Sequence, residues 1–173
     1  IMNCPLASLR TEALAGLGIG FVPEARRLFP DLTVYENIRL GFAATGGRGQ
    51  FDDGLAAMAD RFPIIKQRLR QRAGTLSGGE QAMVALARAI VGEPKLLIMD
   101  EPSLGLSPKL IEEYFDIIRD INRRGTTIFL IEQNAETALS IAHRGYLLVK
   151  GRVAASGVAR DLLDNEMTRH LYF

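Results

Sequence analysis

The chain is poor in cysteine and tryptophan and has no surplus of charge of either sign. Its single cysteine, Cys4, excludes an internal disulfide and is compatible with a reducing compartment. The 21 basic and 20 acidic residues leave a formal charge of +1, so no global field would draw this protein to DNA or RNA. No apolar run reaches the roughly 18 residues that suggest a membrane span. The 173 residues, 47% of them hydrophobic, instead indicate one ordinary globular domain.

Apolar strands alternate with amphipathic helices along the chain, which predicts an α/β domain with a mostly parallel sheet. Residues 96–99 are apolar on both faces, as in a central strand covered by helices. The helical stretch 31–75 interrupts this order, so we expect a helical subdomain inserted between core segments 1–30 and 76–173. Residues 41–50 contain four glycines and are predicted as a loop. The other predicted elements are strands at 18–22 and 126–131, helices at 33–40, 52–61, 64–70, 80–91, 108–124 and from 135, a hairpin at 146–155, and short helices from 161.

Two of the predicted helices begin at clear local signals. Thr33 and Glu36 fit a capping box, in which each side chain accepts a hydrogen bond from the other residue's amide. Ser107 is a good N-cap, and Pro108 after it is favoured in a first helical turn. The helix that starts there is predicted to face inward with its apolar residues Ile111, Tyr114, Phe115, Ile118 and Ile121.

The segment LSGGEQ at 76–81 also opens a helix, and it combines a capping pattern with two glycines. Ser77 and Glu80 fit a capping box, which is a purely structural interpretation. Gly78 and Gly79 argue against that as the whole explanation, because each glycine in a helix costs roughly 0.5–1 kcal/mol relative to alanine. The cost is reasonable where bare N–H groups must contact an anion at the positive end of the helix dipole. The segment alone leaves both interpretations open.

Two adjacent carboxylates, Asp100 and Glu101, follow the predicted central strand. A turn with a helix cap would account for them structurally. Ligands of open α/β sheets, however, bind beyond the carboxyl ends of the strands. Neighbouring carboxylates raise each other's pKa unless a cation offsets their repulsion, and Mg²⁺ bound to nucleotide phosphates is such a cation. One acid would then serve the metal while the other polarises an attacking water.

In this order and spacing the two segments resemble the signature and Walker B motifs of the ABC-type ATPases. Residues 20–37, GFVPEARRLFPDLTVYEN, look like the Q-loop region of ABC importers of the branched-chain amino-acid type. Residues 101–108, EPSLGLSP, resemble that group's D-loop, and residues 131–134, IEQN, resemble its H-loop. The resemblance extends over essentially the whole chain and implies a P-loop NTPase-like α/β fold.

The resemblance also implies a set of roles around ATP and Mg²⁺. Asp100 would serve the Mg²⁺, and Glu101 would act as general base, with Gln133 as a further catalytic residue. Glu24 would lie where the nucleotide site meets the transmembrane subunits and could contribute to the metal. The signature residues would bind ATP held by a partner subunit, the first three at its γ-phosphate: Ser77, Gly78, Gly79, Glu80 and Gln81.

Three positions depart from the usual family pattern. Glu24 stands where most ABC ATPases have glutamine, and Gln133 stands where most have histidine. Glutamine can donate a hydrogen bond to a phosphate but cannot become cationic, whereas Glu24 adds negative charge near phosphates. The branched-chain amino-acid group, which this chain resembles, tolerates both the glutamate and the glutamine at these positions. Ala25 replaces a usual glycine, and the sequence does not indicate the consequence.

A match to the phosphate-binding pattern GxxxxGK[ST] is missing from the chain. Residues 41–48 come nearest but have no lysine, no following Ser or Thr, and no apolar strand before them. In the family this loop and the adenine-stacking aromatic precede the Q-loop, so we expect the chain to correspond to roughly the C-terminal two-thirds of a subunit.

The predicted function is that of the ATP-binding subunit of an ABC importer for branched-chain amino acids or similar small solutes. The expected partners are a second ATP-binding subunit, in a head-to-tail dimer, and transmembrane permease subunits; no nucleic acid is expected. This places the protein peripherally on the cytoplasmic face of the plasma or inner membrane. The alternatives are a soluble ABC-type ATPase of DNA repair or chromosome structure, and a non-catalytic fragment that lends its signature face to another ATPase.

We predict that the purified 173-residue chain shows no ATPase activity above background, because it has no loop amides and lysine to grip the β- and γ-phosphates. Phosphate release with Mg²⁺ and ATP measures this. Mg²⁺-dependent hydrolysis that Glu101→Gln abolishes would contradict the prediction.

Overall fold

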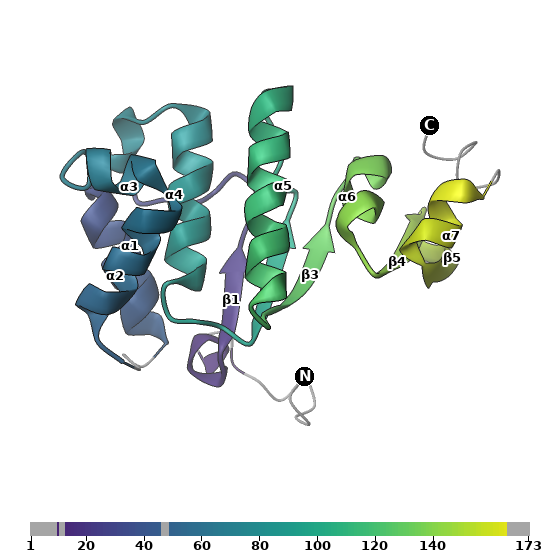
Figure 1. The fold of residues 1–173 in the computed structure, drawn as a ribbon, viewed down its shortest axis with the longest axis horizontal. Helices are drawn as coiled ribbons and strands as arrows, with labels where there is room; N and C mark the ends of the chain where they lie inside the picture. The colour runs from purple at the N-terminus through teal and green to yellow at the C-terminus, as the bar shows by residue number, and fades with distance from the viewer. Residues whose placement is uncertain (1–9, 11–12, 46–48, 166–173) are drawn as a thin grey trace. The chain divides into compact units, whose positions relative to one another are not determined.

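The computed structural model describes residue 10, residues 13–45 and residues 49–165, which form two compact units, 1–129 and 130–173 (Figure 1). Cys4, the centre of the glycine-rich segment and the end of the predicted C-terminal helices lie outside the described residues. The elements are η3 (Ala15–Leu17), β1 (Ile19–Val22), α1 (Val34–Ala44), α2 (Phe51–Arg61), α3 (Pro63–Arg68), η4 (Ala73–Thr75), α4 (Gly78–Ile90), β2 (Leu96–Asp100), α5 (Pro108–Arg123), β3 (Thr127–Ile131), α6 (Ala135–Ile141), β4 (Arg144–Val149), β5 (Arg152–Val158) and α7 (Ala159–Asp164).

The main sheet has the strand order β1-β2-β3, with β2 in the centre as predicted. Strands β1 and β2 run parallel, and Phe21 lies opposite Ile98. Leu97 and Met99 of β2 are fully buried. Helix α4 contacts β1, and a Cβ on Gly20 would lie only 2.5 Å from a backbone carbonyl of that helix. The strand therefore needs glycine at this position to let the helix approach.

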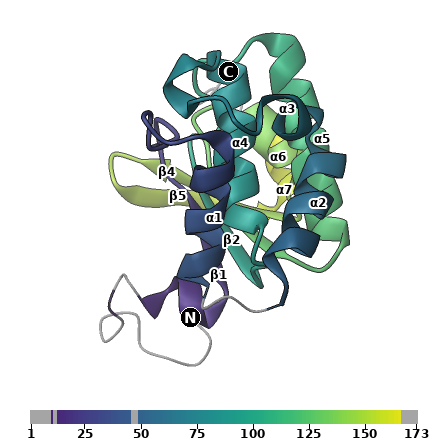
Figure 2. The same cartoon turned by 90° about the vertical axis from the view of Figure 1, so that its left-hand side faces the viewer.

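Helices α1 to α4 form the predicted helical region and its junction with the core (Figures 1 and 2). The capping box of α1 is confirmed: the Thr33 amide donates to Glu36 Oε2 at 2.7 Å, and the Glu36 amide donates to Thr33 Oγ1 at 3.2 Å. The helix continues to Ala44, so the loop predicted at 41–50 was too long. Gly41 belongs to the helix, where a Cβ would meet the carbonyl of Arg88 in α4 at 2.1 Å. Its role is a close helix crossing rather than loop flexibility.

Helix α5 is the long amphipathic helix that the sequence predicts. Ser107 stands at its N-cap position, although its side chain makes no capping hydrogen bond, and Pro108 begins the first turn. The apolar face is buried as expected at Tyr114, Phe115, Ile118 and Ile121. Among the described residues no helix is both long and apolar enough to cross a membrane.

The second unit, described by itself, has a small core of its own. Asn134 caps α6 by accepting a hydrogen bond from the Thr137 amide at 3.0 Å. Strands β4 and β5 pair antiparallel in the predicted hairpin. Its turn residues Lys150 and Gly151 have φ of 49° and 76°, as a two-residue hairpin turn of this hand requires. The buried residues that hold this unit are Leu139, Leu147, Ala159 and Leu162.

Candidate functional site

The two predicted acids lie where β2 leaves the sheet. Asp100 is the last residue of the strand, and both it and Glu101 are half-buried. Glu101 has φ of 43°, in the left-handed region that long side chains rarely occupy. A turn follows, in which the Leu104 amide donates to the Glu101 carbonyl at 3.2 Å. Residues in such sparsely populated conformations cluster at functional sites, so the geometry is consistent with a working role for Glu101.

A second left-handed segment follows β1. Ala25, Arg26 and Arg27 have φ of 58°, 65° and 41°, three non-glycine residues in succession. The turn is closed by hydrogen bonds from the Arg26 amide to the Pro23 carbonyl at 3.2 Å and from the Arg27 amide to the Ala25 carbonyl at 2.7 Å. Glycine adopts such angles without strain, which explains why it is usual at the position of Ala25. Glu24 is exposed at the start of this turn.

Arg88, on α4, holds that turn in place. Its guanidinium donates to the carbonyl of Arg27 at 2.8 Å and to the carbonyl of Arg26 at 3.0 Å. Burial lowers the pKa of Arg88, and hydrogen bonds from the guanidinium to two carbonyls offset the cost of that burial. The bidentate contact ties the strained turn to the helix that the 76–81 segment opens.

The capping box of α4 is also confirmed. The Ser77 amide donates to Glu80 Oε2 at 2.7 Å, and the Glu80 amide donates to Ser77 Oγ at 3.4 Å. Hydrogen bonds from Ser77 lower the pKa of the Glu80 carboxyl. The amides of Gly78 and Gly79 stand in the first turn, where a helix provides no intrahelical acceptor. Capping and anion binding are therefore compatible at this helix start.

Packing within the chain supplies a further reason for the two glycines. A Cβ on Gly78 would lie 3.0 Å from Arg26 Nη1, and a Cβ on Gly79 would lie 2.5 Å from Leu110 Cδ1. The guanidinium of Arg26 and the first turn of α5 thus lie directly against the glycines. Their small size serves the fold as well as any ligand.

Gln81 has local partners in the structure. Its side-chain amide donates to the carbonyls of Ala73 at 3.3 Å and Leu76 at 3.2 Å. It fastens the η4 turn to the start of α4. Its predicted role in nucleotide binding stays a prediction.

A cavity of about 190 Å³ separates the turn after β1 from the Glu101 turn and α4. Ala25, Arg26, Glu101 and Leu104 are among the residues that line it. The structure thus brings the predicted general base next to the Q-loop turn, with the signature helix forming another wall. Gln133 lies exposed in the second unit, before the cap of α6, and is described there alone.

Among the described residues no three His, Cys, Asp or Glu side chains are grouped to hold a metal ion. A Mg²⁺ ion of a phosphoryl-transfer site needs only one or two carboxylates, because phosphates and water supply its other ligands. Asp100 and Glu101 at the exit of β2 fit that sparse donor set.

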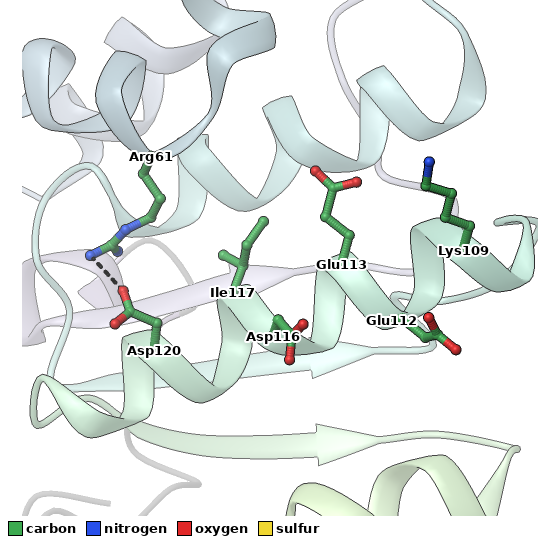
Figure 3. A pocket seen from close by; sticks show the side chains of 7 residues that line it. All are labelled: Arg61, Lys109, Glu112, Glu113, Asp116, Ile117 and Asp120. Carbon is green, nitrogen blue, oxygen red and sulfur yellow. Dashed lines mark ion pairs between the residues drawn. The ribbon is translucent and has the colours of Figure 1, made fainter.

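A larger hollow of about 500 Å³ lies along α5, and none of the predicted site residues is among the residues that line it (Figure 3). Arg61 spans it to Asp120, with 3.5 Å between Nη2 and Oδ2, and burial lowers the pKa of this arginine. In the rest of the wall the acidic residues Glu112, Glu113 and Asp116 outnumber the one basic residue, Lys109, and Figure 3 shows the carboxylates of Glu112 and Glu113 pointing in different directions. Such a surface would repel nucleotide phosphates, so the hollow is no candidate for the nucleotide.

Comparison with known proteins decides the family. The family model described as ABC transporter matches residues 4–104. The chain belongs to the ABC transporter family. The expected α/β ABC ATPase fold and the resemblance to the branched-chain amino-acid type are both confirmed.

Two relatives and one solved structure give the extent of the similarity to other ABC proteins. The chain is 43% identical to the high-affinity branched-chain amino acid transport ATP-binding protein BraG of Pseudomonas aeruginosa, covering 96% of this chain and 71% of that protein. It is 41% identical to the probable branched-chain amino acid transport ATP-binding protein LivF of Archaeoglobus fulgidus, over 93% of this chain and 68% of that protein. An ATP-binding cassette solved as a dimer in a post-hydrolysis state with ADP and phosphate has a TM-score of 0.79, at 24% identity over 92% of this chain and 72% of that one.

Two arginines of the site escaped sequence analysis. Arg88 belongs to the helix predicted at 80–91 and Arg26 to the Q-loop run 20–37, and neither was given a role. The one signal that could have found them was Ala25: its place in the ABC pattern is usually taken by glycine, which favours the left-handed conformation that the structure has there.

The cap of α4 predicts how stability responds to acid. The pKa of Glu80 is lowered from its ordinary value of 4.5 in the folded chain. Its stabilisation is therefore complete above about pH 4.5 and is lost as the pH falls through the lowered pKa. Glu80→Gln keeps a capping box without the titration. Between pH 6 and pH 3 the unmodified chain should lose more in melting temperature than this variant, by up to about 4 °C, the limit set by a cap worth about 1 kcal/mol.

Melting curves followed by circular dichroism at several pH values measure this difference. Equal losses in the two proteins would show that the Glu80 carboxylate is not what acid disrupts at this helix.

Proposed function

We propose that this member of the ABC transporter family couples ATP hydrolysis to the uptake of branched-chain amino acids or similar small solutes. The observation that carries the proposal is the placement of Glu101 and the Q-loop turn around one cavity, with the signature helix as another wall. The names of the two relatives, both branched-chain amino acid transport ATP-binding proteins, support the solute class. They also favour transport over a soluble ATPase of DNA repair.

In this proposal the residues at the C-terminal end of β2 carry out ATP hydrolysis. Asp100 serves Mg²⁺ bound to the ATP phosphates, and Glu101 accepts a proton from the attacking water. The left-handed backbone at Glu101, φ 43°, turns the chain sharply directly after the strand. Gln133, in the second unit, stays a predicted hydrogen-bond donor to a γ-phosphate, on the resemblance of its motif alone.

The signature helix acts on the nucleotide of a second ATP-binding subunit. The amides of Gly78 and Gly79, at the positive end of the α4 dipole, suit a γ-phosphate presented from outside the chain. The capping box of Ser77 and Glu80 fixes the direction of those amides. The dimer of the solved ATP-binding cassette supports a paired arrangement.

The transmembrane permease subunits dock on the helical segment that follows the Q-loop. Phe29 and Leu40, which are 52% and 44% exposed, offer apolar surface there for a membrane partner. Asn37, fully buried, donates from its side-chain amide to the carbonyls of Phe29 at 3.1 Å and Thr33 at 3.0 Å. It therefore keeps the segment next to Glu24 in a fixed shape. The subunit works peripherally, at the cytoplasmic face of the membrane.

Glu101→Gln tests the general base in an assembled transporter whose ATP-binding subunit includes the phosphate-binding loop that these 173 residues do not contain. Glutamine keeps the size of the side chain but cannot accept the proton, so hydrolysis should fall by roughly 10²–10⁴-fold. ATP should still bind, and the ATP-bound dimer should accumulate. Phosphate release and nucleotide affinity measure the two effects. Loss of affinity with no block of hydrolysis would place Glu101 in binding instead.

Ser77→Arg tests the signature helix. A bulky side chain at the helix start should keep the partner's γ-phosphate away from the Gly78 and Gly79 amides, so ATP-driven dimerisation and hydrolysis should both collapse. Thr33→Arg is a matched control, because it removes an equivalent capping box from α1. Both variants should lose about 1 kcal/mol of stability.

Size-exclusion chromatography with ATP and melting temperatures separate these effects. If Ser77→Arg dimerises as well as Thr33→Arg does and differs from the unmodified protein only in its melt, Ser77 serves as a cap and nothing more.

A further inference from the structure

We propose that Arg26 is a positioning residue that holds the Glu101 loop, residues 101–106, against the start of the signature helix. The inference rests on the proposed function, because it takes Glu101 as the general base. Arg26 does not need to touch the nucleotide for this role. Its effect is to fix where the backbone carrying Glu101 lies.

The contacts of Arg26 join three segments that are distant in the sequence. Its Nη2 donates to the carbonyl of Leu104, in the Glu101 loop, at 3.2 Å. The same guanidinium lies where a Cβ on Gly78 would come within 3.0 Å of it, and a Cβ on Gly105 within 3.7 Å. One side chain from the Q-loop turn thus reaches both the signature helix and the loop of the general base.

The backbone from which Arg26 extends is itself anchored to the signature helix. Arg88 donates to the carbonyls of Arg26 and Arg27 at 3.0 and 2.8 Å. The left-handed conformation of this turn fixes the direction in which the Arg26 side chain leaves it. A side chain on so constrained a base holds its hydrogen-bond partner in a defined place.

Packing alone does not fix the Glu101 loop. The cavity of about 190 Å³ lies between this loop, the Q-loop turn and α4, so part of the loop has no side chains against it. Leu104 is 51% exposed, which leaves its side chain little to pack against. Glu101 has φ of 43°, and a strained residue of this kind persists only where its surroundings determine it. The hydrogen bond to Leu104 is such a determinant.

The positive charge of Arg26 argues that specific contacts, and not chance, keep its guanidinium beside the start of α4. A helix N-terminus is the positive end of the dipole, where a cation is unfavourable. An arginine with no role there would turn its guanidinium toward water. Arg26 instead stays against Gly78 while it donates to Leu104.

Arg26→Ala tests the proposal in an assembled transporter whose ATP-binding subunit includes the phosphate-binding loop that these 173 residues do not contain. A loosened Glu101 loop should lower kcat by roughly 10- to 100-fold, the scale of a misplaced catalytic group, with the KM for ATP within about twofold. Arg26→Lys should recover part of kcat, because lysine can donate to the Leu104 carbonyl but cannot also span Gly78. Arg27→Ala is the matched control: it removes an exposed arginine from the same left-handed turn but leaves the hydrogen bond from Arg26 to Leu104, so kcat should fall less than in Arg26→Ala.

Hydrogen exchange gives a readout that does not depend on turnover. The amides of Leu104 and Leu106, which close the turns of the loop onto Glu101 and Ser103, should exchange faster in Arg26→Ala than in Arg27→Ala. Unchanged exchange together with unchanged kcat would overturn the positioning role. An equal loss of activity and melting temperature in both arginine variants would also overturn it, since the turn would then be acting only as a structural support.

Glu101→Gln, measured in the same preparation, distinguishes a failure of this inference from a failure of the proposed function. If Glu101→Gln leaves hydrolysis unaffected, the role of Glu101 is wrong and the positioning proposal falls with it. If Glu101→Gln stops hydrolysis while Arg26→Ala keeps full kcat, the function stands and only the role of Arg26 is refuted.

Discussion

The guanidinium of Arg88 is the constraint on which the arrangement of this site depends. Three successive non-glycine residues, 25–27, occupy the left-handed region, each at a cost of order 1–3 kcal/mol. Hydrogen bonds from a charged donor, worth about 1.5–3 kcal/mol each, are among the few local interactions strong enough to offset this. Arg88 makes two of them, to the carbonyls of Arg26 and Arg27. Without that contact the turn would relax to a less strained conformation, and the Arg26 side chain would no longer be held against the Glu101 loop.

The glycines of this chain show that a motif can have two causes. Gly79 suits the approach of a phosphate, yet a Cβ there would also meet Leu110 at 2.5 Å. Gly41 has a packing role alone, as the crossing point of α1 with α4. A substitution at Gly79 would therefore disturb the packing of α5 and any bound phosphate together. Ser77, whose side chain is exposed beside the same amides, separates the two effects more cleanly.

Sequence predicted the features that short-range physics determines. The capping boxes at Thr33 and Ser77 each need only residues three apart, and both formed as expected. The central position of β2 followed from apolar residues on both of its faces. The C-terminal end of α1 was missed because a glycine such as Gly41 indicates a loop in the sequence. Only the structure shows that Gly41 lies against the backbone of Arg88. The arginine contacts were missed for the same reason, since they join residues 62 and 78 positions apart.

The Q-loop turn contacts the signature helix at two points rather than one. Arg88, near the C-terminal end of α4, donates to the backbone of the Q-loop turn. Arg26 of that turn lies against Gly78, the first residue of α4. Ten residues separate these points, which is about 15 Å along a helix. A helix held at one point can tilt about it, whereas one held at both ends must move with whatever holds it. If permease subunits that dock on the helical segment after the Q-loop, as proposed, also displace this turn, the displacement would carry the signature helix as a rigid body. Through the Leu104 carbonyl it would carry the Glu101 loop as well, so the two halves of the catalytic machinery would respond to the membrane partner together.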